Sequence, residues 1–71
     1  MFGIIRKKKV ITYLESEIEF LDELIDKTRK VLRGMDSTTL AEERIYHEDR
    51  LNEYINRKTQ CRMILQRIYR M

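Results

Sequence analysis

The sequence predicts an all-α fold of two long antiparallel helices, a coiled-coil-like helical hairpin that dimerises into a four-helix bundle. Three observations predict it. Apolar residues recur at alternating steps of three and four, the spacing that lines one face of an α-helix. The 71 residues include two glycines and no proline, so little interrupts a helix. Charged residues make up 38% of the chain, which is typical of long solvated helices in one small domain.

The first helix is expected over about residues 6–33, with a start between Ile5 and Val10. Its seam, the row of residues that faces the second helix, repeats every seven residues, with isoleucine and leucine largely alternating as in coiled coils. Gly34, which can take a left-handed conformation, follows a basic last turn and predicts the end of the helix. The members of this seam are Ile11, Leu14, Ile18, Leu21, Ile25, Thr28, Leu32 and Met35.

A turn is expected over residues 34–38. Thr39 with Glu42 three residues later forms a capping box, the pattern that opens many helices. Asp36 or Ser37 are alternative caps, because their side-chain oxygens can accept a hydrogen bond from a helix N–H group.

The second helix is expected over about residues 39–70, and its seam is more polar than the first. A short turn between long helices produces an antiparallel pair. Aligning the two seams gives a register in which Leu32 meets Leu40 beside the turn and Leu14 meets Lys58 further along. The same register ends with Ile4 against Ile68. The second seam consists of Leu40, Arg44, His47, Leu51, Tyr54, Lys58, Cys61, Leu65 and Ile68.

Both helices carry more large apolar residues than one seam requires. Each one left in water forgoes roughly 1.5–3 kcal/mol of burial, and a contiguous exposed patch usually marks an interaction surface. We therefore expect a homo-oligomer, with a dimer favoured, and also expect a larger protein partner. The residues predicted to mediate self-association or partner binding are Val10, Tyr13, Phe20, Leu24, Val31, Ile45, Ile55 and Ile64.

The formal net charge of +3 hides a segregation of charge. Residues 15–26 hold six acidic groups and no basic group, whereas both ends of the chain are basic. Antiparallel pairing brings those ends together into one basic pole, which suits phosphate groups or an acidic partner. The residues predicted for this role are Arg6, Lys7, Lys8, Lys9, Arg57, Arg62, Arg67 and Arg70.

No catalytic arrangement is apparent, so we expect a protein that is not an enzyme and that has no cofactor or metal. The predicted register places Asp22 and Asp26 across from His47, but a single histidine fits a hydrogen-bonded, half-buried side chain better than a metal ligand. The single cysteine, Cys61, fits a small apolar seam residue better than a reactive thiol.

The chain is expected to be cytoplasmic, or to lie in the host cytoplasm if it comes from a mobile element. One cysteine fits a reducing compartment. Apolar residues precede the basic run 6–9, the reverse of a secretory signal, and a membrane partner is therefore not favoured.

Three functions follow from these surfaces. The leading hypothesis is a non-enzymatic interaction module or small regulator that self-associates and binds a larger protein. The first alternative is a nucleic-acid-binding accessory protein that uses the basic pole. The second is a small inhibitor of a nucleic-acid enzyme, of the kind that phages encode, in which the acidic segment 15–26 imitates phosphates.

Overall fold

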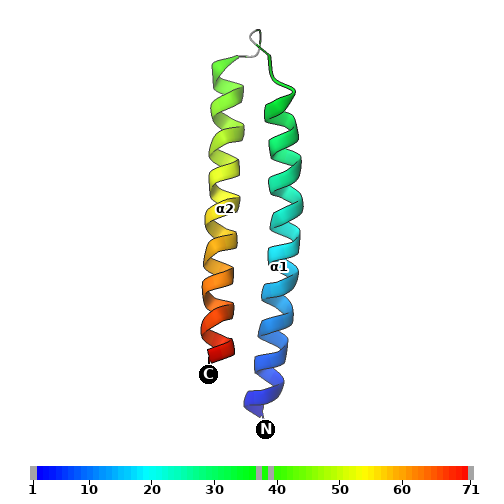
Figure 1. Ribbon diagram of the computed structural model, residues 1–71, viewed down its shortest axis with the longest axis vertical. Coiled ribbons are helices and arrows are strands. Elements are labelled where there is room, and N and C mark those ends of the chain that lie inside the picture. Colours follow the sequence, from blue (N-terminus) through cyan, green and yellow to red (C-terminus); the bar gives the residue numbers. More distant parts are fainter. Residues whose placement is uncertain (1, 37, 39, 71) are drawn as a thin grey trace.

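The computed structural model contains two long α-helices that pack side by side in opposite directions (Figure 1). It describes residues 2–36, 38 and 40–70, with side chains from residue 6 onward. Helix α1 spans Phe2–Arg33 and α2 spans Ala41–Arg70. Within the described residues there is no strand, and the hairpin is a rod measuring 59 × 15 × 14 Å.

Both seams predicted from the sequence face each other. Every seam residue of α1 from Ile11 onward is buried or half-buried, as are the seam residues of α2 from His47 onward. The buried core consists of Leu14, Leu21, Ile25 and Cys61, with Leu21 the most enclosed at 1% exposure. The polar seam residue Thr28 is also satisfied, because its hydroxyl donates a hydrogen bond of 2.7 Å to the Leu24 carbonyl one turn earlier.

Helix α1 starts earlier than expected and ends at the expected residue, Arg33, although not with the expected cap. It begins at Phe2, earlier than the expected start, since no helix-breaking proline precedes Arg6. At its C-terminus Gly34 does not take the left-handed conformation that the sequence predicts. The Gly34 N–H still donates to the Lys30 carbonyl at 3.1 Å, and Met35 N–H donates to Leu32 at 3.2 Å, so the helix ends in a tighter turn.

The connection is longer than predicted, because α2 starts at Ala41. The Leu40 carbonyl accepts the first bonds of α2, from the N–H groups of Glu43 and Arg44. The Asp36 carboxylate accepts a bond of 2.9 Å from the Thr38 N–H and thus shapes the turn. The other two predicted caps, Ser37 and Thr39, lie outside the described residues.

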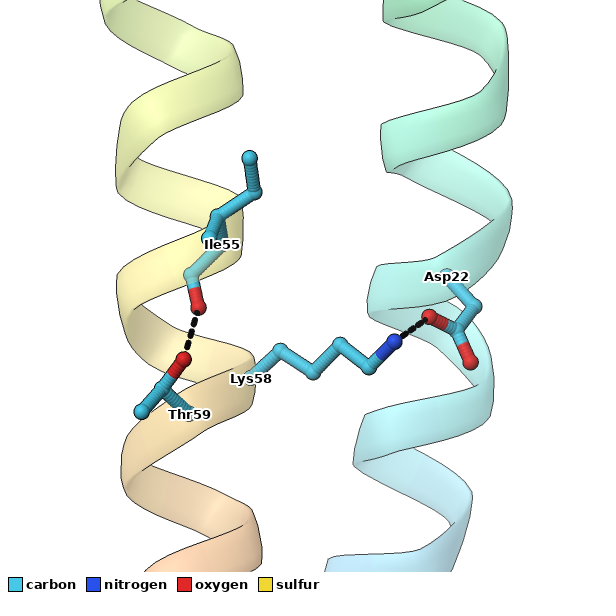
Figure 2. A network of polar contacts seen from close by, with 4 residues as sticks. All are labelled: Asp22, Ile55, Lys58 and Thr59. Carbon is cyan, nitrogen blue, oxygen red and sulfur yellow. Dashed lines mark hydrogen bonds and ion pairs between the residues drawn. The ribbon is translucent and has the colours of Figure 1, made fainter.

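The register of the two helices corrects the predicted one. Asp22 forms an ion pair with Lys58 (Figure 2), whereas the predicted register places Leu14 opposite Lys58. The Tyr69 hydroxyl donates to Glu15 at 3.3 Å, where Arg57 was expected. The helices are therefore shifted by about one heptad, a step that keeps seam against seam because both seams repeat every seven residues. The predicted meeting of Ile4 with Ile68 lies outside the described side chains.

The charges of the seam explain this shift. The predicted register would enclose Lys7 and Arg44, and burying an unpaired charge is costly. In the observed register both are exposed, because the first turn of α2 and the start of α1 extend past the opposite helix (Figure 1). Leu40 moves out of the seam with them and is 67% exposed. The shift thus keeps the two charged side chains exposed to water, and in exchange the apolar side chain of Leu40 is also exposed.

Candidate interaction surfaces

The two sides of the hairpin seam differ in chemistry. On one side, which we call the charged side, Asp22 and Asp26 of α1 line an open hollow together with Lys58 and Arg62 of α2. On the opposite side, Lys27 and Val31 of α1 line a hollow with Tyr46 of α2. Because residues seven apart share a helix face, each of these rows can be followed along the whole helix.

A row of mostly apolar residues runs along α1 on the side of Lys27 and Val31. Its members alternate in steps of four and three, so they form a second continuous stripe beside the seam. All of them are exposed except Leu24 and Glu17, which are half-buried. Phe20 lies at the centre and is 55% exposed. We call this row the apolar stripe, and it consists of Val10, Tyr13, Glu17, Phe20, Leu24, Lys27 and Val31.

The structure separates the residues predicted for self-association into two groups. Six of them lie on the side of the apolar stripe, five on α1 and Ile64 on α2, where Ile64 borders a hollow with Met63 and Arg67. Ile55 lies on the charged side, where it lines the hollow of Asp22. Ile45 is two heptads before Thr59, which lines that same hollow, and therefore also belongs to the charged side.

Sequence reasoning named the apolar members of the stripe but missed Glu17 and Lys27. The signal was present, because these two residues occupy the stripe positions left open between the apolar ones. In the part of the chain that the structure describes, neither residue forms an ion pair within the hairpin. The stripe is thus an apolar surface with two unpaired charges of opposite sign.

The charged side brings the acidic segment of α1 against basic residues of α2. The corrected register has this effect, because it brings Lys58 and Arg62 beside Asp22. Lys58 reaches across the seam to Asp22 (Figure 2), and Arg62 shares two hollows with Asp22. Within α2, the Thr59 hydroxyl donates to the Ile55 carbonyl at 2.9 Å.

Tyr69 marks the far end of the charged side. Its pKa is raised above the ordinary value, first by partial loss of surrounding water and then by the negative charge of Glu15, which accepts the Tyr69 hydrogen bond. Both effects favour the neutral phenol, because ionisation would place a second negative charge beside a carboxylate. This contact therefore holds only while Tyr69 keeps its proton.

The predicted basic pole is divided by the register. Arg6, Lys7, Lys8 and Lys9 are all exposed on the part of α1 near the C-terminal end of α2, where exposed Arg67 and Arg70 lie (Figure 1). Arg62 instead lies beside Asp22 and Asp26 on the charged side. Arg57 borders an outward-facing hollow of α2 with Arg50 and Glu53. The pole is thus smaller than predicted, and we call its six residues at the termini the basic end.

His47 and Cys61 both occupy seam positions. His47 is half-buried, and its ring meets that of Tyr46 edge-on with 5.3 Å between the ring centres. Asp22, which the sequence placed across from His47, is paired with Lys58 instead. Cys61 is a buried free thiol packed in a cluster with Leu14 and Leu21. Among the described residues, no three or more His, Cys, Asp or Glu side chains gather as a metal site would require.

Neither helix, over its described residues, combines the length and apolar character needed to cross a bilayer. No protein-family model, curated protein or solved structure matches the chain. The apolar stripe and the basic end are therefore the features from which a function can be inferred.

Proposed function

We propose that this protein is a non-enzymatic interaction module that self-associates through the apolar stripe and binds a larger partner as a small regulator. One observation carries the proposal: a row of mostly apolar residues runs along α1 outside the hairpin seam. Scattered exposed apolar residues are ordinary on protein surfaces, but a contiguous row usually marks an interface.

The small size of the hairpin core supports self-association. Four buried residues, of which Leu21 is the most enclosed, form the described core. A two-helix chain of this length buries a limited fraction of its surface alone, and small domains commonly gain stability by oligomerising. Covering the stripe would add a second row of contacts, made by the five apolar residues of the stripe.

Light scattering coupled to size-exclusion chromatography tests self-association. We expect a mass of at least twice the 8.8 kDa of one chain, with dissociation on dilution. Phe20→Ser should lower the mass to that of one chain, because Phe20 lies at the centre of the stripe. A single-chain mass for the unaltered protein at all concentrations would contradict the proposal.

Ile45→Ser is the matched control for Phe20→Ser. Both residues are 55% exposed, but Ile45 lies on the charged side, so the substitution removes a similar apolar surface from a different face. We expect Ile45→Ser to keep the mass of the unaltered protein. Circular dichroism of both variants should report unchanged helix content, which separates loss of association from loss of folding.

The basic end favours a second candidate function, binding to nucleic acid. Six exposed cationic side chains lie there, on the described parts of both helices. Phosphate contacts made by such groups weaken as salt concentration rises, because binding releases condensed counterions. The acidic segment is a weaker candidate for phosphate mimicry, since Asp22 already pairs with Lys58.

Fluorescence anisotropy with labelled DNA and RNA tests this second function. If the basic end binds phosphates, replacing Lys7, Lys8 and Lys9 with glutamine should abolish binding at low salt. Replacing Arg29, Lys30 and Arg33 with glutamine is the control, because these three exposed residues lie near the other end of α1, outside the seam and the stripe, and should matter little. Undetectable binding by the unaltered protein at low salt would exclude the function.

A further inference from the structure

We infer that the occupant of the apolar stripe is the same stripe of a second copy, with the two α1 helices antiparallel about a two-fold axis near Asp22. The inference rests on the proposed self-association and specifies its orientation, register and ion pairs. It makes α1 the inner helix of a dimer, in contact with α2 through one face and with the second α1 through another.

The first step is that α1 carries two seams. The stripe repeats the alternating steps of three and four that define the hairpin seam, and this is the spacing that packs one helix along another. Each stripe residue directly precedes a seam residue in the sequence, so at about 100° per residue the two rows are centred roughly 100° apart around the helix. A second helix can therefore pack on the stripe without displacing α2.

The second step is the symmetry of the charges within the stripe. Glu17 and Lys27 lie at equal numbers of residues before and after Asp22. When two copies of α1 pack antiparallel around that point, Glu17 of each copy meets Lys27 of the other. The stripe is thus complementary to itself, as a two-fold interface requires.

The apolar residues agree with the same register. Phe20 then meets Leu24 of the second copy, and Tyr13 meets Val31. Val10 meets Gly34, which is exposed and leaves room for it. A shift of one heptad in one direction would press Glu17 against Phe20, and a shift in the other would press Lys27 against Leu24. Because either shift sets a charge against an apolar side chain, one antiparallel register is favoured.

A parallel arrangement is disfavoured by the same two residues. It would set Glu17 against Glu17 and Lys27 against Lys27, and like charges in direct opposition destabilise a helix pair. In the antiparallel dimer both α2 helices lie on one side of the α1 pair. The result is a four-helix arrangement in which the two α1 helices are central.

Charge reversal tests the register, with sedimentation equilibrium as the measurement. Glu17→Lys and Lys27→Glu should each raise the dimer dissociation constant about tenfold or more, because each creates two like-charge contacts. An equal mixture of these two variants should associate again, since every Glu17–Lys27 contact is then restored as an opposite-charge pair. The double variant should dimerise like the unaltered protein.

Glu23→Lys and Lys30→Glu are the matched controls. They change the net charge identically, and both residues are exposed on the outer face of α1, away from seam and stripe. A dimer that none of the reversals weakens would overturn the inferred register and leave self-association intact. A monomeric unaltered protein would overturn both.

Discussion

Near the terminal end of the hairpin, one hydrogen bond beside the seam joins the two helices. The Tyr69 hydroxyl and the Glu15 carboxylate come from different helices and from opposite ends of the sequence. Contacts between exposed side chains add little stability. The Tyr69–Glu15 contact is therefore more useful as a marker of the register of the two helices than as a source of stability. Its value is that its state changes with pH, because the pKa of Tyr69 is raised.

The Tyr69 contact predicts a loss of stability in alkali. A phenol whose pKa is higher in the folded chain than in the unfolded chain stabilises the fold below the unfolded pKa, which is about 10. That contribution disappears as pH rises through the folded pKa. Urea unfolding between about pH 8 and 11 should therefore lose stability more steeply for the unaltered protein than for Tyr69→Phe. Glu15→Gln should reduce the slope as well, and equal slopes in all three would contradict the prediction.

Gly34 predicts a stabilising substitution. Its φ is not positive, its N–H keeps a helical hydrogen bond, and an added Cβ would meet carbonyl oxygens at 3.6 Å, an ordinary contact. Gly34→Ala should therefore raise the free energy of unfolding by about 0.5–1 kcal/mol, because alanine loses less backbone entropy on folding. The urea midpoint measures it. A lowered midpoint would mean that alanine at position 34 is disfavoured, either by the backbone or because its methyl group crowds Val10 of the second copy in the inferred dimer.

At the scale of the helices, the sequence predicts which faces meet but not how far they slide. The sevenfold repeat identifies both seams, from Ile11 to Met35 and from His47 to Ile68. A sevenfold repeat cannot distinguish registers that are seven residues apart. The register is therefore decided by whether Lys7 and Arg44 are buried in the seam or exposed to water. Because the register could not be predicted, the division of the basic pole could not be predicted either. The sequence predicted the apolar residues of the stripe as a surplus beyond the seam. It did not show that Glu17 and Lys27 lie in the same row.

Lys58 places a positive charge within the α2 seam, and replacing it tests what that charge costs in stability. Its side chain is 28% exposed and its partner Asp22 is 48% exposed, so the ion pair is only partly shielded from water. Replacing such a pair by apolar contact is often neutral or stabilising. Asp22→Leu combined with Lys58→Met should therefore raise the free energy of unfolding by about 1 kcal/mol, whereas Lys58→Met alone leaves the Asp22 carboxylate without its partner and should give no gain. Urea unfolding measures both variants; a loss of stability in the double variant would mean that the ion pair outweighs apolar packing.

At the scale of the whole molecule, the hairpin is a rod with little interior. Its radius of gyration is 16.5 Å, compared with about 11 Å for a compact domain of this length. Interfaces on such a rod run along its length and not into a pocket. In the inferred dimer the two basic ends would point in opposite directions, with corresponding residues roughly 40 Å apart along the axis at 1.5 Å per residue. Two identical charged ends at a fixed separation suit a long or repeated partner.

The small interior also predicts that folding depends on concentration. If the dimer supplies much of the stability, the melting temperature should rise with protein concentration by mass action. For a chain of this size we expect about 3–5 °C per tenfold increase. Circular dichroism melts over a roughly hundredfold range measure this. Phe20→Ser should melt at one temperature throughout, and a concentration-independent melt of the unaltered protein would contradict the prediction.

The buried thiol of Cys61 can be used to measure how often the two helices separate. The sequence holds one cysteine, and it is enclosed between the helices beside Leu14 and Leu21. Because Cys61 is only 9% exposed, a thiol reagent labels the chain mainly when the helices separate, and the labelling rate reports how often they do. The interval between openings can be compared between dilute and concentrated solution, or with and without a partner, using the natural sequence and no added probe.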